Sequence, residues 1–411
     1  MDQTRRSSPA EVEAFIELVD AMPDHHQETL ARHPQVLILA ARYGDGHLRA
    51  AKAVALELFQ TDPDPSLGLL DYYRFVNPRL DKSIRWAYLS SVRFVPGLWR
   101  WFYTSTQRID PTSNTQKFLN HIGLNRFYQA VQQSPPEVIV STYPTAAGVV
   151  STLKRRGRLN SANFVVMTDY SVHSQWIHPG VDRYFVGSED MKLELMERGL
   201  REETIVVSGI PVDDRFRLPV DEHRVRESLG LGEEPVVLFM GGAYMPQTEF
   251  ESVLGSIDQV PVAHATIVIA GRAGQRRAIA EAYRSRAQNR LVVLDYVNNV
   301  HELMAISSML VSKAGGLTTT ESLCRGLPVV IYRPIPGQED ANADFLQRHG
   351  VGIRAHREGE VGEIVSQLLA SPWQLKAMAR QARQLGHPEA AETVARHVLE
   401  ARLARRANAP A

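Results

Sequence analysis

Short apolar runs that alternate with helix-like segments constrain the fold of this chain more than any other feature. In the first half, strand-like runs occur at 36–41, 138–140, 164–167 and 184–186. After a pause near Gly209-Ile210-Pro211, a second series follows at 236–240, 266–270, 291–294, 309–311 and 329–332. This alternation is typical of parallel α/β sheets. We therefore predict two Rossmann-like lobes with a linker near residues 208–218, and ligands in a cleft beyond the carboxyl ends of the strands.

The predicted organisation has four parts. Residues 1–33 form a polar N-terminal extension that lacks the apolar core of a signal peptide. An N-terminal lobe over 34–215 and a C-terminal lobe over 216–385 follow. Residues 386–411 hold a basic amphipathic helix, from Pro388 to about Arg406, which we expect to pack back across the lobes. No apolar run reaches the roughly 20 residues that span a bilayer, so we expect a cytoplasmic chain or one attached to a membrane from the cytoplasmic side.

The charge balance gives no preference for polyanions. Lys plus Arg and Asp plus Glu each number 46, so no global field favours nucleic acid. The single cysteine, Cys324, excludes a disulfide framework and a cysteine-rich zinc site. It lies in a helix-like segment, where we interpret it as a small buried residue rather than a nucleophile.

A glycine pair follows the strand-like run 308–311. The segment reads Ser312-Lys313-Ala314-Gly315-Gly316-Leu317-Thr318-Thr319-Thr320-Glu321 and opens a helix-like stretch. Glycines let the backbone approach a ligand, and the free N–H groups of a helix start attract an anion such as phosphate. Glu321, one turn later, can accept hydrogen bonds from sugar hydroxyls. The alternative is an ordinary glycine loop capped by Thr318.

Two further segments of the second half support a nucleotide-sugar site. Gly241-Gly242 repeats the strand-to-glycine turn, and two such turns in one lobe indicate a diphosphate site. After the run 329–332, the loop from Arg333 to Ala343 contains residues that can divide the hydroxyls of a sugar among donors and acceptors. These residues are Gln338, Glu339 and Asn342. The structural alternative is that they only cap a solvated helix.

The first glycine loop reads Tyr43-Gly44-Asp45-Gly46-His47. Arg49 occupies the position of the third glycine of a dinucleotide fingerprint, and the loop lacks a Walker A lysine. It places an imidazole at the start of a helix expected over 47–60. A helix N-terminus disfavours imidazolium, so His47 should be neutral and able to accept a proton. A capping or packing histidine is the alternative.

The segment 168–179 is polar and aromatic and follows a strand-like run. One interpretation of the spacing of Asp169, His173 and His178 is a metal site. Pro179 and the absence of a His-Glu-x-x-His pattern indicate a loop without a metal. We expect this segment to form a wall of the cleft or to contact an acceptor.

Residues 72–108 combine aromatic and basic side chains. They hold ten aromatic and seven basic residues against one acid, Asp81. Trp, Tyr, Lys and Arg favour the headgroup zone of anionic membranes. The same composition is also found in proteins that bind single-stranded nucleic acid and in helical hairpins, here one packed on the first lobe. We predict a membrane-facing surface, since nothing else indicates nucleic acid. Its predicted members are Arg85, Trp86, Arg93, Trp99, Arg100 and Trp101.

Together these segments resemble glycosyltransferase family 28, the group of monogalactosyldiacylglycerol synthases and processive diacylglycerol glucosyltransferases. The resemblance covers about Gln35 to Gly352. It includes the glycine loops at 43–47 and 312–318, the run 168–182 and the segment Pro336-Gly337-Gln338-Glu339. It implies a GT-B fold and metal-independent, inverting transfer of a hexose from a UDP-sugar to a lipid such as diacylglycerol. It also implies that the N-terminal lobe holds the acceptor at the membrane and that no cofactor is needed.

Residue by residue, the resemblance implies three groups of site residues. The donor side comprises Gly241, Gly242, Gly315, Gly316, Leu317, Thr318, Glu321, Gln338, Glu339 and Asn342. His47 is similar to the residue that takes part in deprotonating the attacking hydroxyl, with Asp169 as a second catalytic residue. The acceptor side comprises Gly44, Gly46, His173 and Trp176.

Several alternatives stay open on the sequence. One is a UDP-N-acetylglucosamine transferase that acts on a polyprenyl-linked or other lipid. A non-hydrolysing UDP-sugar epimerase and a non-enzymatic UDP-sugar sensor at the membrane are two more. The donor sugar, the exact lipid, processivity and the oligomeric state are not determined by these residues. We expect a peripheral protein on the inner face of the cell membrane.

Overall fold

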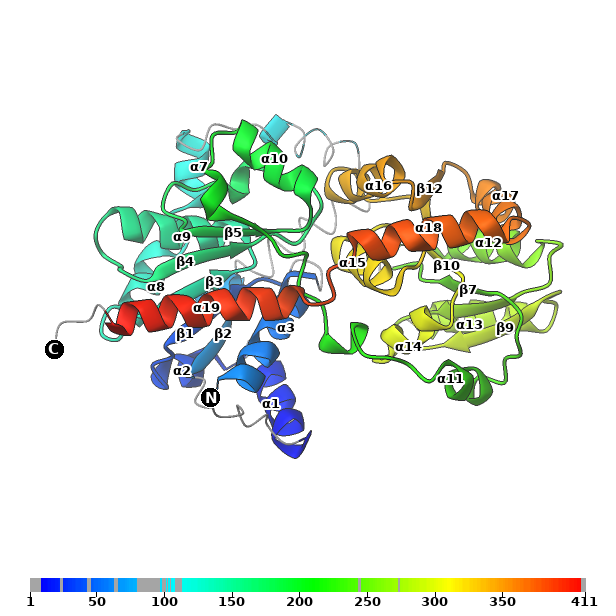
Figure 1. Cartoon of the computed structure of the whole chain (residues 1–411), viewed down its shortest axis with the longest axis horizontal. Helices are drawn as coiled ribbons and strands as arrows, with labels where there is room; N and C mark the ends of the chain where they lie inside the picture. The colour runs from blue at the N-terminus through cyan, green and yellow to red at the C-terminus, as the bar shows by residue number, and fades with distance from the viewer. Residues whose placement is uncertain are drawn as a thin grey trace. The chain divides into compact units, whose positions relative to one another are not determined.

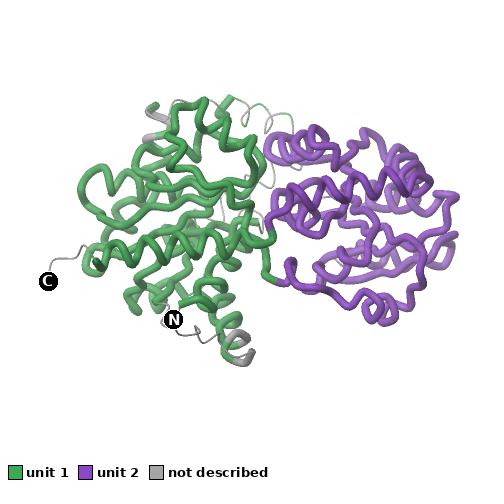
Figure 2. The backbone as a smooth tube through the Cα atoms, viewed as in Figure 1, with its two compact units in different colours: residues 1–214, 388–411 green, residues 215–387 purple. Residues whose placement is uncertain are grey.

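The computed structural model describes residues 9–22, 25–42, 46–62, 66–79, 97, 101, 103, 105–107, 113–242, 245–272 and 274–407. The chain forms two compact units, shown in Figure 2. The first comprises residues 1–214 together with 388–411, and the second comprises 215–387. Each unit is built on its own parallel sheet, so the predicted α/β class with two Rossmann-like lobes is confirmed.

Unit 1 contains a six-stranded sheet in the order β2-β1-β3-β4-β5-β6. Its strands are β1 (Val36–Ala40), β2 (Leu67–Asp71), β3 (Val138–Ser141), β4 (Ala162–Val166), β5 (Arg183–Val186) and β6 (Ile205–Val207). All the pairings are parallel, with Val36 opposite both Leu67 and Val138. Because β1 is followed by β2 on one side and by β3 on the other, the strand order reverses at β1 and β3.

Helices cover both faces of this sheet (Figure 1). They are α1 (Pro9–Ala21), α2 (His26–Ala31), α3 (Gly46–Thr61), α4 (Tyr72–Val76), α7 (Asn114–Leu119), α8 (Leu124–Val131), α9 (Pro144–Arg155), α10 (Glu189–Glu197) and α19 (Ala390–Ala407), with 3-10 turns η1 (Ser174–Trp176) and η2 (Glu202–Thr204). Alternate β1 side chains face opposite layers: Ile38 packs with α3 and α19, and Leu39 with α8 and α9. The continuous apolar run of β1 thus fits a strand buried on both faces.

Unit 2 repeats this plan with the order β12-β11-β10-β7-β8-β9. Its strands are β7 (Val236–Phe239), β8 (Ala265–Ile269), β9 (Arg290–Leu294), β10 (Met309–Ser312), β11 (Val329–Tyr332) and β12 (Gly352–Ala355). All these pairings are also parallel. The strand order reverses at β7 and β10, so ligands are expected beyond the carboxyl ends of this pair.

Each strand of unit 2 is followed by a helix, and one 3-10 turn and one helix precede its first strand. The turn and the helices are η3 (Asp214–Phe216), α11 (Glu222–Ser228), α12 (Gln247–Asp258), α13 (Gly274–Arg284), α14 (Val300–Ala305), α15 (Gly316–Arg325), α16 (Gln338–Arg348), α17 (Glu358–Leu369) and α18 (Pro372–Leu385). The main core joins β7, β10 and β11 to α12 and α17, with Phe239 stacked on Phe250 at 5.1 Å between ring centroids. These contacts stabilise the strands that position the glycine turns.

Each strand-like run predicted from the sequence overlaps an observed strand. The strands that the prediction did not name are β2, β6 and β12, and all three lie at the edge of a sheet. Their sequences are short or interrupted: β2 contains Gly68, β6 has three residues, and β12 contains Gly352 and Arg354. An edge strand has one neighbour rather than two, so its sequence needs a weaker apolar pattern.

Both ends of the chain contribute to unit 1. The predicted C-terminal helix is α19, which packs on α3, and α1 adds Phe15 to the same core by stacking on Phe59 at 3.8 Å. The segment assigned to a polar extension thus supplies core residues as well. Among the described residues, no helix is both long enough and apolar enough to cross a bilayer.

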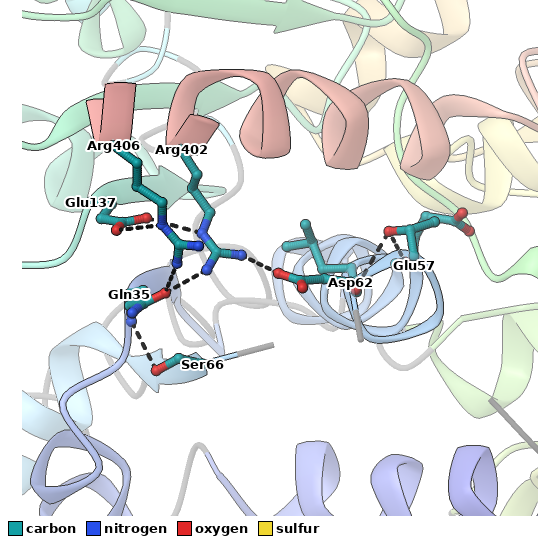
Figure 3. Close-up of polar contacts among 9 residues, drawn as sticks. Gln35, Glu57, Asp62, Ser66, Glu137, Arg402 and Arg406 are labelled. Carbon is teal, nitrogen blue, oxygen red and sulfur yellow. Dashed lines mark hydrogen bonds and ion pairs between the residues drawn. The ribbon is translucent and has the colours of Figure 1, made fainter. Parts of the chain in front are cut away.

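Two arginines attach the end of α19 to unit 1 (Figure 3). Arg402 is 6% exposed, and its guanidinium contacts Asp62, Gln35 and Glu137, with 3.1 Å from Nε to Oε2 of Glu137. Arg406, one turn later, places Nε 3.2 Å from Oε1 of the same glutamate. A planar guanidinium with several acceptors loses little freedom per hydrogen bond, so this network fixes the C-terminal helix on the unit.

Candidate active site

The predicted catalytic histidine lies where the strand order of unit 1 reverses. His47 is the second residue of α3, and this helix follows β1. Its backbone carbonyl accepts a hydrogen bond from Oγ1 of Thr142, which follows β3, at 2.9 Å. The contact joins the loops after both central strands, so β1 and β3 together hold the start of α3 in place.

The imidazole of His47 has a polar contact on one side and aromatic rings around it. Nδ1 lies 2.7 Å from Oγ1 of Thr168. The ring of Tyr143 meets the imidazole edge to face at 5.1 Å, and the ring of Trp176 lies at 6.3 Å. The imidazole also has a hydrogen bond with the backbone of Thr142. Because Thr168 engages Nδ1, Nε2 is the nitrogen that we assign to proton exchange with a ligand.

Burial changes the protonation of His47. Desolvation among these neighbours lowers the pKa of His47 from 6.5 to about 4, against an opposing contribution from its hydrogen bond with Thr142. The ring is thus neutral at physiological pH. The sequence predicted a neutral imidazole from the helix start, whereas in the structure desolvation by burial is the cause that lowers the pKa of His47.

The other predicted residues of this side divide into two groups. Trp176, 5% exposed, and Gly46, the first residue of α3, lie beside His47. The charge of Asp169 acts on Tyr103, where it adds to burial, the main cause that raises the pKa of that phenol. The hydroxyl of Thr168, which sequence reasoning did not single out, occupies the place beside Nδ1. Gly44 lies outside the described residues.

His173, predicted on the acceptor side, uses both ring nitrogens for protein contacts. Nδ1 accepts the N–H of Gln175 at 3.2 Å, so the proton of the neutral ring is on Nε2. Nε2 lies 3.2 Å from Oγ1 of Thr106. Burial lowers the pKa of His173 to about 4. His173 therefore holds the neighbouring segments at Gln175 and Thr106 in place, and both of its ring nitrogens are used in these contacts.

The metal site considered for Asp169, His173 and His178 is not formed by the described residues. Nε2 of His178 lies 3.1 Å from the carbonyl oxygen of Pro144, and burial lowers the pKa of His178 to about 4. Within the described part of the chain, no group of His, Cys, Asp and Glu is arranged to hold a metal ion.

Residues 103 and 105–107, the described end of the aromatic and basic segment, are attached to this loop. Oγ of Ser174 donates to the carbonyl of Thr106 at 2.8 Å, and Nη1 of Arg198 donates to that of Gln107 at 3.3 Å. Trp101 is 65% exposed. The other predicted membrane contacts lie outside the described residues: Arg85, Trp86, Arg93, Trp99 and Arg100. The loop that supplies Thr168 and Trp176 thus also anchors the end of this segment.

In unit 2, the glycine pair forms the predicted turn between β10 and α15. Gly315 is the N-cap, and α15 begins at Gly316, so the first backbone N–H groups of the helix are available at the carboxyl end of the strand. Ala314 has a φ of 63°, a left-handed value that is uncommon outside glycine and is often found at functional sites. Asn342, which is fully buried, donates Nδ2–H to the Ala314 carbonyl at 3.1 Å.

The residues predicted to contact the donor differ in how they are placed. Gln338 and Glu339 are half-buried at the start of α16, and Oε2 of Glu339 accepts the N–H of Ile335 at 2.6 Å. A Cβ placed on Gly315 would lie 3.6 Å from Oε1 of Glu339, so this carboxylate lines the turn. Asn342 supports the turn through its buried amide. Leu317 and Glu321 are buried in α15, and Thr318 is half-buried.

The second glycine turn brings two cations that sequence reasoning missed. Gly242 has a φ of 67°, which favours glycine, and its carbonyl accepts a hydrogen bond from Nη1 of Arg276. The Lys313 side chain approaches this turn from β10. Lys313 lies inside the glycine motif, so the sequence could have indicated its place at the turn. Arg276 lies in α13, and no local sequence pattern indicates that it contacts this turn.

Comparison with known proteins assigns the two halves of the chain to two family models. Residues 47–212 match the model of monogalactosyldiacylglycerol (MGDG) synthase. Residues 221–385 match that of glycosyl transferases group 1. The boundary between the matched regions falls close to the passage from unit 1 to unit 2.

Two curated relatives and one solved structure extend this comparison. The chain is 30% identical over 373 residues to processive diacylglycerol beta-glucosyltransferase of Bacillus subtilis, covering 89% of this chain and 95% of the relative. It is 29% identical over 371 residues to the protein of that name from Bacillus licheniformis, with coverages of 89% and 94%. The crystal structure of MurG from Acinetobacter baumannii covers 89% of this chain and 100% of its own, with a TM-score of 0.59 at 15% identity. This likeness confirms the GT-B fold.

Proposed function

Because the chain belongs to the family of monogalactosyldiacylglycerol synthases and processive diacylglycerol glucosyltransferases, we propose that it transfers a hexose from a UDP-sugar to a lipid acceptor such as diacylglycerol. The product is a glycolipid, and the anomeric configuration of the sugar inverts in the transfer. A fold of this kind hosts several reactions, so the reaction type has to be argued from the site.

The observation on which this proposal depends most is the state of His47. A neutral imidazole that is held by Thr168 through Nδ1 meets the requirements of a general base. In the proposed reaction, Nε2 takes the proton of the acceptor hydroxyl as the oxygen attacks C1 of the sugar. Trp176 and Tyr143 supply apolar surface beside the imidazole, which suits an uncharged lipid hydroxyl better than a water-filled site.

The donor is assigned to the carboxyl ends of β7 and β10. The amide groups at the start of α15 face the diphosphate, and the Gly242 turn supplies further backbone at the same edge. Gln338 and Glu339 take the hydroxyls of the sugar, and Glu321 takes those of the ribose. Asn342 acts indirectly, because its amide holds the Ala314 carbonyl.

The reaction needs no metal or cofactor in this proposal. As the C1–O bond breaks, its electron pair moves to the β-phosphate, and UDP leaves with one more negative charge. Electropositive groups of unit 2 stabilise that charge in the role that a divalent cation has in other sugar transferases. The donor is therefore a substrate rather than a cofactor.

The lipid acceptor places the reaction at a membrane surface. We assign the attachment to the aromatic and basic segment 72–108, whose described end is anchored to the loop beside His47. Basic side chains near an anionic surface contribute about 1 kcal/mol each. The protein would then bind the inner face of the cell membrane peripherally and would not bind nucleic acid.

The test is a transfer assay with purified protein, UDP-glucose or UDP-galactose, and vesicles that contain diacylglycerol, with products identified by mass spectrometry. We expect a hexosylated lipid and equimolar UDP. A His47→Ala variant should turn over about 100-fold more slowly or worse while binding UDP normally. Release of an epimerised UDP-sugar without acceptor, or binding without any transfer, would replace this proposal by an epimerase or a sensor.

A further inference from the structure

Lys313 lies between the two glycine turns of unit 2. It directly follows β10 and begins the turn that leads through Gly315 to α15. A Cβ placed on Gly242 would lie 3.7 Å from Cδ of Lys313. The lysine side chain therefore runs from the end of β10 toward the end of β7, across the position where the strand order of the sheet reverses.

Among the residues that the structure describes, none is a direct counter-ion of the Lys313 ammonium group. Within the described ranges, Lys313 makes no hydrogen bond or ion pair, although its side chain is only partly exposed. Burial lowers the pKa of Lys313; the charge of Glu339 opposes this shift, and that of Arg276 adds to it. Keeping a desolvated charge without a partner is costly for stability, and such groups concentrate at functional sites.

The surroundings of Lys313 are net cationic. Arg276 is 8% exposed and donates to the Gly242 carbonyl, so its position is set by the turn. Glu339 is the nearby carboxylate, but its Oε2 already accepts the N–H of Ile335. Among the described residues, the charges that act on Lys313 are those of Arg276 and Glu339, so these three groups leave one positive charge at the edge formed by the two glycine turns. An anionic ligand would offset that charge.

We propose that Lys313 binds the diphosphate of the nucleotide sugar and that Arg276 positions the Gly242 turn against it. This inference rests on the proposed function and adds residues to its donor site. When C1 transfers to the acceptor oxygen, the C1–O electron pair stays on the β-phosphate and the hydroxyl proton goes to His47. The charge near Lys313 therefore grows during the reaction, so the ammonium stabilises the transition state more than the bound substrate.

Calorimetric titration of the full chain with UDP and with uridine tests this assignment. For Lys313→Met we expect about 10- to 100-fold weaker UDP binding, the usual range for loss of a charge-assisted hydrogen bond. Uridine binding should not change, because uridine has no phosphate. The melting temperature of Lys313→Met should equal or exceed that of wild type, since the substitution removes a desolvated charge. A purely structural lysine would give a lower melting temperature instead.

Two further variants complete the experiment. Lys313→Arg keeps the charge and should retain a large part of the UDP affinity. This variant tests the role of the charge even if Lys313→Met folds poorly. Arg277→Met is the matched control for Arg276→Met, because Arg277 is the next residue of α13 but is 47% exposed and paired with Asp295. Only Arg276→Met should weaken UDP binding.

The outcomes separate this inference from the proposed function. If wild type binds UDP and Lys313→Met and Lys313→Arg bind it equally well, Lys313 has no role at the diphosphate, while the transferase proposal stands. If wild type binds no UDP, the donor site itself is wrong. Equal loss of UDP and uridine affinity in Lys313→Met would indicate a distorted site and would overturn the charge argument.

Discussion

The hydroxyl oxygen of Thr168 lies 2.7 Å from Nδ1 of His47, although 121 residues separate them in the sequence. Thr168 follows β4, whereas His47 follows β1. In this arrangement, the hydroxyl orients the ring and leaves Nε2 for the acceptor. A neighbour at Nδ1 is how proteins select the working nitrogen of a histidine.

Thr168→Val removes this hydroxyl with little change in shape. We expect kcat to fall about tenfold, the loss of one hydrogen bond to the base, while UDP affinity stays constant. Thr168→Ser, which keeps the hydroxyl, should restore most of the activity. Unchanged kcat in the valine variant would show that His47 needs no partner at Nδ1.

The pH dependence of transfer should reflect the shifted pKa of His47. The pKa is lowered to about 4, so the base form predominates at all higher pH values. We expect kcat/KM to be nearly flat between about pH 6 and 8, without an acid limb centred near 6.5. Initial rates with a circular-dichroism control for folding provide the measurement. A midpoint close to 6.5 would contradict a desolvated base.

Buried neutral histidines should make unit 1 sensitive to acid. The pKa values of His173 and His178 are about 4 in the folded protein, against 6.5 for an exposed ring. Between these values the unfolded chain binds more protons, so stability falls as pH falls through this window. From about pH 7 to 5 we expect a loss of about 2 kcal/mol for each ring.

A His178→Gln variant checks this assignment. Glutamine can still donate to the Pro144 carbonyl but does not titrate, so the free energy of unfolding should depend less steeply on pH than in wild type. Urea titrations at the two pH values give this comparison. An identical pH dependence would mean that His178 is not the group that titrates.

The attachment of α19 predicts a specific loss of stability. Replacing Arg402 by methionine leaves Asp62 and Glu137 without their buried cation, which should lower the free energy of unfolding by about 3 kcal/mol. Arg396→Met is the control on the same helix, because Arg396 is 58% exposed and its ion pair with Glu400 spans 3.6 Å. Its effect should stay below about 0.5 kcal/mol.

Urea unfolding of both variants, each carrying Trp373→Phe so that no tryptophan remains in unit 2, can be followed by fluorescence, with Trp176 buried in unit 1. Equal effects of the two substitutions would show that the Arg402 network does not hold the helix. A loss confined to Arg402→Met would show that the chain end is an integral part of this unit.

The sequence determined the features that depend on neighbouring residues. The apolar runs predicted the central strands, the glycine pairs predicted both turns of unit 2, and His47 was predicted at a helix start. These features follow from backbone conformation and side-chain periodicity within a few residues, so they can be read locally. Three of the four edge strands, β2, β6 and β12, were missed because their local patterns are weak.

Only the tertiary structure decided which distant residues meet. Strand order brought Thr168 to His47, Lys313 to the Gly242 turn, and Arg402 to Asp62. Apolar periodicity states that a strand is buried, but it does not state which strands are neighbours. Contacts between loops at the ends of different strands therefore became known only once the order of the sheets was fixed.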